Sequence, residues 1–119
     1  MTDTATLYHN PRCSKSRAAL EYLGQSGLNI TTIHYLQTPP DRDTLREILT
    51  ELQLTPRQLM RQSDATYKEL NLNDDNLTED QLLDAMVENP ILIERPIVRL
   101  NGEAAIGRPL DNLIALIDE

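Results

Sequence analysis

The sequence predicts an α/β protein with more helix than strand, in the order β-α-β, several helices, then β-β-α. Composition limits the strand content, because the 119 residues include only two valines and neither phenylalanine nor tryptophan. Extended segments bounded by turn residues stand near both ends of the chain, and amphipathic helical patterns with capping signals fill the middle. This length suits a single domain over residues 1–119, with a helical insertion at about 41–90.

The first half of the chain supplies the β-α-β part. Residues 5–9 form a short strand that ends at Asn10-Pro11, because the residue before a proline prefers β geometry. Residues 14–22 carry a broad apolar face and predict a helix, which Gly24 or Gly27 can end. Residues 29–35, rich in threonine and isoleucine, predict the second strand.

Helix-capping residues predict where the helices in the middle of the chain begin, and a turn sequence predicts the hairpin that follows them. Asp41 is a candidate N-cap for a helix with apolar residues at 45, 48, 49 and 52. Capping boxes at Thr55 and Thr78 predict a short helix through 60–61 and a longer one through 87. Asn101-Gly102 favours a type I′ hairpin between strands 97–100 and 103–106, and residues 110–117 predict the last helix.

Charge and cysteine content exclude several classes of protein. A net charge of −8 disfavours nucleic-acid binding, and the longest apolar run, at 113–117, is too short to span a membrane. A lone cysteine excludes a disulfide scaffold, and the N-terminus lacks signal-peptide features. We therefore expect a soluble, cytoplasmic monomer. Residues 64–88 carry eight acidic residues against one lysine, which predicts either a solvated helical surface or an acidic docking face.

The lone cysteine, Cys13, falls where the first strand meets the first helix. Free N–H groups and the helix dipole at a helix N-terminus stabilise a thiolate over a thiol. Arg12, Lys15 and Arg17 add positive charge, and His9 adds more if it is protonated and close. Because the thiolate is the nucleophilic form of cysteine, this pattern favours a reactive residue over an inert buried one.

Spacing restricts what this thiolate attacks. A tyrosine-phosphatase loop needs an arginine six residues after the cysteine, and position 19 is alanine. A dithiol oxidoreductase needs a second cysteine where this chain has Ser16, so any disulfide must involve an outside thiol such as glutathione. His34, the other histidine, is expected to be structural or superficial, and the cysteine and histidines show no metal-ligand spacing.

Four separated segments resemble the glutaredoxin-coupled arsenate reductase family, over essentially the whole chain. They comprise His9-Asn10-Pro11-x-Cys13 with Arg17, Leu59-Met60-Arg61, the run from Asn89 to Ile97, and Ile106-Gly107-Arg108-Pro109. The resemblance implies a thioredoxin-like fold. Pro96 is similar to the proline that is cis beside the active cysteine in such folds. Ser14-Lys15-Ser16 departs from the Gly-Thr-Ser that commonly follows the cysteine in this family.

The resemblance also implies roles for individual residues. Cys13 is the nucleophile, Arg61, Arg95 and Arg108 bind the oxyanion, and His9, Arg17 and Ser16 stabilise the thiolate. Arsenate is then reduced to arsenite through a covalent cysteine–arsenate adduct. Glutathione and glutaredoxin are the electron donors and partners, and no metal or bound cofactor is needed.

Two other functions are consistent with the same residues. One is a monothiol, glutathione-dependent oxidoreductase that acts on another oxyanion or on a disulfide, although the three arginines then have no role. The other is a non-enzymatic regulator, because the same fold group includes proteins that bind RNA polymerase. Such regulators typically carry a Cys-x-x-Cys switch, which Ser16 removes here.

Overall fold

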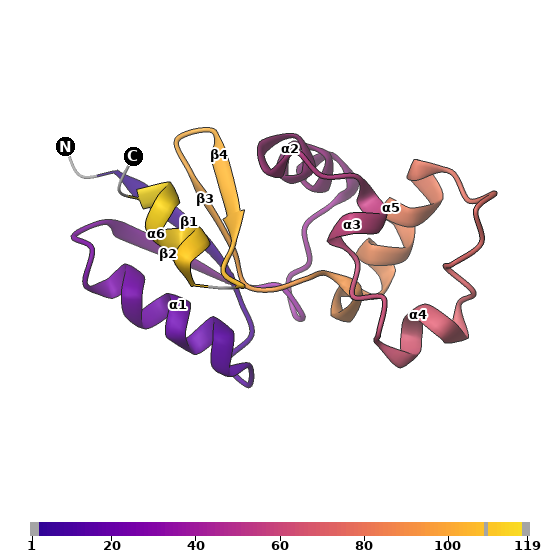
Figure 1. Cartoon of the computed structure of the whole chain (residues 1–119), viewed down its shortest axis with the longest axis horizontal. Coiled ribbons are helices and arrows are strands. Elements are labelled where there is room, and N and C mark those ends of the chain that lie inside the picture. The colour runs from indigo at the N-terminus through magenta and orange to yellow at the C-terminus, as the bar shows by residue number, and fades with distance from the viewer. Residues whose placement is uncertain (1–2, 109, 118–119) are drawn as a thin grey trace. The chain divides into compact units, whose positions relative to one another are not determined.

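A computed structural model describes residues 3–108 and 110–117 of the chain (Figure 1). The chain forms two compact units. One consists of the segment up to Thr38 together with the segment from Arg95 onward, and the other is the intervening Pro39–Glu94.

A four-stranded sheet forms the centre of the first unit. The strands are β1 (Thr4–His9), β2 (Asn29–His34), β3 (Ile97–Leu100) and β4 (Glu103–Ile106), in the order β2-β1-β3-β4. β1 and β2 are parallel and pair from Thr4 with Asn29 to His9 with His34, whereas β3 is antiparallel to both β1 and β4. Both residues of the β3–β4 turn have positive φ, 53° at Asn101 and 81° at Gly102, as the predicted type I′ turn requires.

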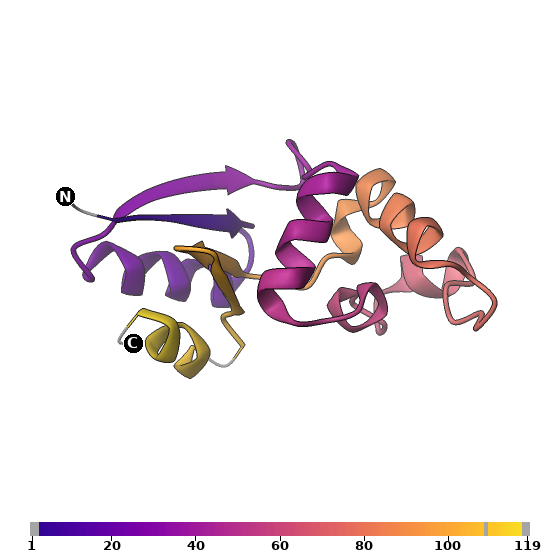
Figure 2. The same ribbon diagram turned by 90° about the horizontal axis from the view of Figure 1, so that it is seen from above.

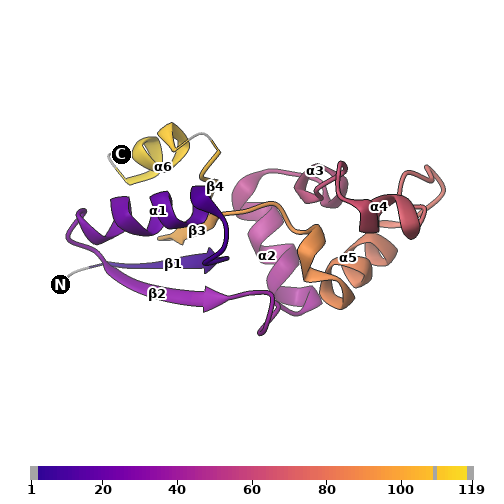
Figure 3. The ribbon, with the colours of Figure 1, turned by 90° about the horizontal axis from the view of Figure 1, so that it is seen from below.

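Two helices cover one face of this sheet. Figures 2 and 3 show α1 (Ser14–Gly24) and α6 (Asp111–Ile117) on the same side of the strands. Alternate strand residues point toward these helices, as the period of two in a strand dictates. The buried cluster between them consists of Ala5, Leu7, Ala19, Leu23, Val98, Leu100, Leu113 and Leu116. This core fixes the junction between β1 and α1, which carries Cys13.

The second unit is helical, with α2 (Arg42–Leu52), α3 (Pro56–Leu59), α4 (Ala65–Glu69), α5 (Glu79–Glu88) and the 3₁₀ turn η1 (Pro90–Leu92). The three predicted N-caps are confirmed. Asp41 accepts a hydrogen bond from the Thr44 N–H at 2.8 Å, and Thr55 and Thr78 each form a complete capping box. Side chains thus satisfy N–H groups that a helix start leaves without partners.

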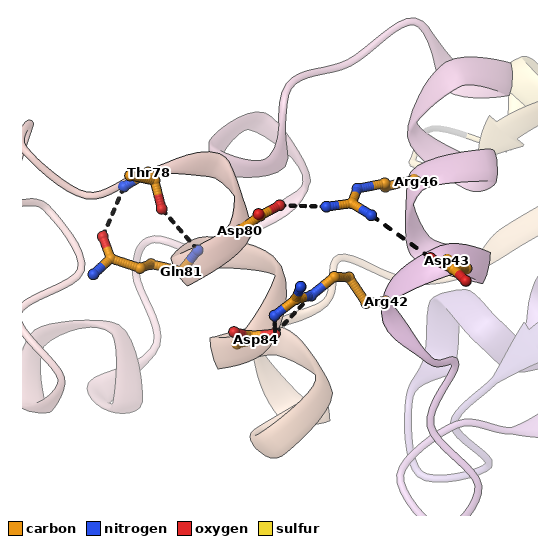
Figure 4. A network of polar contacts seen from close by, with 7 residues as sticks. All are labelled: Arg42, Asp43, Arg46, Thr78, Asp80, Gln81 and Asp84. Carbon is orange, nitrogen blue, oxygen red and sulfur yellow. Dashed lines mark hydrogen bonds and ion pairs between the residues drawn. The ribbon is translucent and has the colours of Figure 1, made fainter.

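Ion pairs join α2 to α5 within this unit. Figure 4 shows Arg42 bound to Asp84, and Arg46 between Asp80 of α5 and Asp43 of its own helix. These side chains are between 41% and 91% exposed, so each pair contributes little to stability.

The structure differs from the sequence-based expectation at three helices. α3 ends at Leu59 rather than at 60–61, because Met60 is extended and forms a β-bridge with Ile93. α4 and η1 were not predicted, because five and three residues are too short to show an apolar period. No helix in the described ranges 3–108 and 110–117 is long and apolar enough to cross a membrane.

Candidate active site

Cys13 is the N-cap residue of α1, at the carboxyl end of the β1 strand. Its backbone is extended, with φ −95° and ψ 123°, and its N–H donates to the Asn10 carbonyl at 2.9 Å. The Asn10 side chain in turn accepts a hydrogen bond from the Arg12 N–H at 3.0 Å. These bonds close a tight turn over Asn10-Pro11-Arg12, which directs the chain from the strand into the helix.

The thiol of Cys13 is more acidic than an ordinary cysteine thiol. Burial of the side chain, which is 8% exposed, raises its pKa. Hydrogen bonds outweigh that effect and lower the pKa from 9.0 to about 6, the donors being the N–H groups of Ser16 and Lys15 and the side chains of Arg108 and Arg95. At neutral pH the thiolate, which is the nucleophilic form, is therefore favoured over the thiol.

Arg108 links the thiol to the loop between β4 and α6. Its Nη2 donates to Cys13 Sγ at 3.5 Å, and its Nε donates to the Arg95 carbonyl at 2.8 Å. The neighbouring Gly107 has no room for a side chain, because a Cβ there meets Pro96 Cγ at 2.9 Å. Its N–H donates to the Pro96 carbonyl at 2.9 Å, and the Arg95–Pro96 peptide bond is cis. Close packing at Gly107 thus positions the Arg108 side chain.

Ser16 and Arg17 belong to the first turn of α1 and follow Cys13 by three and four residues. Ser16 is completely buried, and its hydroxyl has no hydrogen-bond partner in the part of the chain that the structure describes. Its backbone N–H donates to Cys13. The Arg17 guanidinium donates to the Pro11 carbonyl at 3.0 Å, which ties the helix to the active-site turn.

His9 ends β1 and is only 5% exposed. Burial lowers its pKa below 6.5, and the positive charges of His34 and Arg17 lower it further. The surroundings therefore favour a neutral imidazole rather than the imidazolium that the charge argument for His9 requires. Its role toward the thiolate stays a prediction.

Arg61 belongs to the Pro39–Glu94 unit and follows α3. Its N–H donates to the Leu92 carbonyl at 2.7 Å. Its guanidinium pairs with Asp64 at 3.4 Å and donates to the Ile91 carbonyl at 3.4 Å. The structure thus brings Cys13, Arg95 and Arg108 together within one unit and gives Arg61 partners within the other, so its role in the site also stays a prediction.

His34, which the sequence predicts to be structural or superficial, is exposed, and its ring lies against that of His9. Both residues end neighbouring parallel strands and are register partners. His9 is the last residue of the predicted strand 5–9 and His34 the last but one of the predicted strand 29–35, so the available signal was that both lie near the carboxyl ends of predicted strands. Both line a cavity of about 190 Å³ beside the active-site turn, together with Asn10, Pro11, Arg12, Leu36 and Gln37.

The donor groups of the site suit an anion rather than a metal. Within residues 3–108 and 110–117, no group of three or more His, Cys, Asp or Glu side chains could hold a metal ion. Around Cys13, by contrast, backbone N–H groups and two guanidinium groups converge on one sulfur. Forked, permanently charged arginine donors match the oxygens of a small oxyanion.

The sheet, the covering helices and the cysteine at the start of α1 define a thioredoxin-like protein with a single thiol at the N-terminus of its first helix. The ArsC family model matches residues 8–116, and the chain belongs to that family. The chain is 50% identical to an arsenate reductase of Neisseria meningitidis over 112 residues, 93% of this chain and 96% of the relative. It is 49% identical to the uncharacterized protein YfgD of Escherichia coli, over 98% of this chain and 99% of that protein. The arsenate reductase structure from Vibrio cholerae has a TM-score of 0.93 and 43% identity, covering 97% of this chain and 98% of that one.

Proposed function

We propose that the protein reduces arsenate to arsenite with Cys13 as nucleophile and with glutathione and glutaredoxin as electron donors. One observation carries the proposal: a thiol with a pKa of about 6 has Arg108 Nη2 3.5 Å from its sulfur and Arg95 beside it. Arsenate is the oxyanion that we choose, because a relative named arsenate reductase is identical to this chain at 50% of 112 residues.

The arginines address the main physical obstacle to this reaction. A thiolate that attacks arsenate brings one anion against another, so the barrier includes their repulsion. Arg95 and Arg108 offset that repulsion and hold the oxyanion, since they already surround the sulfur. We assign Arg61 to the same oxyanion from the family resemblance. We assign His9, Ser16 and Arg17 to stabilisation of the thiolate.

In the first step the Cys13 thiolate attacks arsenic. A sulfur–arsenic bond forms, and an arsenic–oxygen bond breaks as the departing oxygen takes up protons and leaves as water. Arsenic stays at oxidation state five in this adduct. Attack at arsenic needs a deprotonated sulfur, which the lowered pKa of Cys13 supplies at neutral pH.

Electrons are transferred in the second step. The thiolate of glutathione attacks the Cys13 sulfur, a disulfide forms, and the electron pair of the sulfur–arsenic bond stays with arsenic, which leaves as arsenite. Two thiols are thereby oxidised and one arsenic is reduced by two electrons. Because Ser16 stands where a second cysteine is needed for self-resolution, an outside thiol must complete the cycle. Glutaredoxin attacks the glutathione sulfur and releases the Cys13 thiolate.

The test is NADPH consumption with glutathione, glutathione reductase and glutaredoxin, with and without arsenate. We expect arsenate-dependent oxidation with the wild type and none with Cys13→Ser. Arg46→Gln serves as a control, because its guanidinium pairs with Asp43 and Asp80 within the Pro39–Glu94 unit. Arsenate-dependent turnover by Cys13→Ser would disprove the mechanism.

The acidic thiol without a resolving cysteine also suits a monothiol, glutathione-dependent oxidoreductase. A glutathionylated test peptide distinguishes the two activities. If the wild type reduces this peptide faster than it reduces arsenate, and Arg108→Lys leaves peptide reduction unchanged, the disulfide is the substrate. If arsenate is preferred and Arg108→Lys slows its reduction, the oxyanion is the substrate.

A further inference from the structure

Arg61 differs from the other arginines of the Pro39–Glu94 unit in how its guanidinium is held. Arg42 is bound through Nε and Nη2, and Arg46 and Arg57 are each bound through Nη1 and Nη2. Within residues 3–108 and 110–117, by contrast, the guanidinium of Arg61 is bound through Nη1 alone. Its Nε and Nη2 donors are therefore available to a ligand.

The Nη1 atom of Arg61 is held from two sides. It donates to Asp64 Oδ2 at 3.4 Å and to the Ile91 carbonyl at 3.4 Å. The side chains of Arg61 and Asp64 are 23% and 17% exposed, so solvent screens this ion pair less than it screens fully exposed pairs. The remaining donors, Nε and Nη2, form one edge of the guanidinium, and such a fork can bind two oxygens of one anion.

Both members of this pair are fixed by other contacts as well. The Arg61 N–H donates to the Leu92 carbonyl at 2.7 Å, which holds the backbone beneath the guanidinium. Asp64 is the N-cap of α4, and its Oδ1 accepts a hydrogen bond from the Thr66 N–H at 2.9 Å. One carboxylate oxygen thus binds the start of α4 while the other binds Arg61. Because the helix start anchors Asp64, its carboxylate can orient the guanidinium.

We propose that Asp64 is a positioning residue that holds Arg61 through Nη1 and presents its Nε–Nη2 edge to the oxyanion. This inference rests on the proposed function, which assigns Arg61 to arsenate. An arginine that is already oriented loses less side-chain freedom when it binds an anion, so it binds that anion more tightly. The oxyanion takes the edge that Asp64 leaves open, and the ion pair therefore stays in place while the oxyanion is bound.

Asp64→Ser separates the two tasks of this residue. Serine is also a good N-cap, so the start of α4 keeps an acceptor, but its side chain is too short to maintain the ion pair with Arg61. Asp41→Ser is the matched control. Asp41 caps α2 by accepting from the Thr44 N–H at 2.8 Å, and it forms no ion pair in the part of the chain that the structure describes. Circular dichroism confirms that both variants are folded.

We expect the KM for arsenate to rise roughly fivefold in Asp64→Ser, with kcat changed by less than about twofold, and neither to change in Asp41→Ser. The substitution is then repeated in Arg61→Gln. If Asp64 acts through Arg61, it causes no further rise in KM there, whereas a role in folding α4 alone raises KM equally in both backgrounds. An equal rise would overturn the proposal. A lower KM in Asp64→Ser would also overturn it, because the carboxylate would then be a competitor of the oxyanion.

A binding measurement separates this inference from the proposed reaction. The Nε–Hε NMR signal of Arg61, identified by its absence in Arg61→Gln, is followed as arsenate is added without glutathione. We expect the signal to shift, and the midpoint to need roughly fivefold more arsenate in Asp64→Ser than in the wild type. If the midpoints differ in this way but the wild type does not reduce arsenate, the proposed function fails and the role of Asp64 stands. Equal midpoints, or a signal that does not respond to arsenate, would refute that role whether or not arsenate is reduced.

Discussion

Removal of the Arg108 guanidinium tests the electrostatic account of the active site most directly. In Arg108→Ala, Cys13 Sγ loses a donor at 3.5 Å and the positive charge that comes with it. The other donors, which are the N–H groups of Ser16 and Lys15 and the side chain of Arg95, remain. The thiol should therefore become a weaker acid without returning to the behaviour of a free cysteine.

The size of the effect follows from the pKa of Cys13. That pKa is lowered from 9.0 to about 6, which corresponds to about 4 kcal/mol in favour of the thiolate. Four donors supply this amount and also offset the opposing effect of burial. An equal share for each donor predicts that Arg108→Ala raises the pKa of Cys13 to roughly 7. At pH 6 the thiolate fraction then falls from about one-half to roughly one-tenth.

The assay is the rate of alkylation by iodoacetamide as a function of pH, checked against the ultraviolet absorbance of the thiolate. Relative to the plateau rate of each protein at pH 10, we expect Arg108→Ala to react roughly five times more slowly than the wild type at pH 6. Arg46→Ala is the matched control, because it also removes a guanidinium but one that pairs with Asp43 and Asp80. Superimposable curves for Arg108→Ala and the wild type would refute the assignment of Arg108 to the thiolate.

Two further predictions concern stability. The pKa of Cys13 is lower in the native state than in the unfolded chain, so its ionisation stabilises the fold fully above pH 9, and this contribution disappears as the pH falls through about 6. In urea unfolding between pH 6 and pH 9, the free energy of unfolding of the wild type should rise by about 1.4 kcal/mol per pH unit relative to that of Cys13→Ser. A difference that does not change with pH would contradict this linkage. Gly107→Ala places a Cβ 2.9 Å from Pro96 Cγ and 3.1 Å from Leu113 Cδ1, which should cost about 1–3 kcal/mol and also raise the pKa of Cys13. Gly24→Ala, where a Cβ meets nothing within 4 Å, should show neither effect.

The sequence predicted the fold best where side chains act on the adjacent backbone. Thr55 and Thr78 cap their helices through bonds to residues three positions ahead, and Asn101-Gly102 sets its own turn. The end of α3 was mispredicted because a distant partner determines it. Met60 leaves the helix to pair with Ile93, more than thirty residues further along the chain, and helix propensity contains no information on that bridge.

The same distinction between adjacent residues and distant partners applies to the candidate site. The position of Cys13 at the start of α1 followed from local residues, as did the expectation of a reactive thiol. Arg108, by contrast, is 95 positions from Cys13, and only the family resemblance suggested that the two residues belong together. The contact between His9 and His34 depends on strand pairing, which local patterns do not specify.

The backbone donors of the site determine which amino-acid substitutions are tolerated in the residues that follow Cys13. Two of the groups that lower the pKa of Cys13 are the N–H groups of Lys15 and Ser16, which every amino acid except proline provides. The side chains at positions 14 to 16 can therefore be substituted without loss of the two backbone hydrogen bonds that lower the pKa of Cys13. Ser14-Lys15-Ser16 in place of Gly-Thr-Ser is compatible with an equally acidic thiol. A proline at position 15 or 16 is the change that this loop could not accept, because it would remove a donor that no side chain replaces.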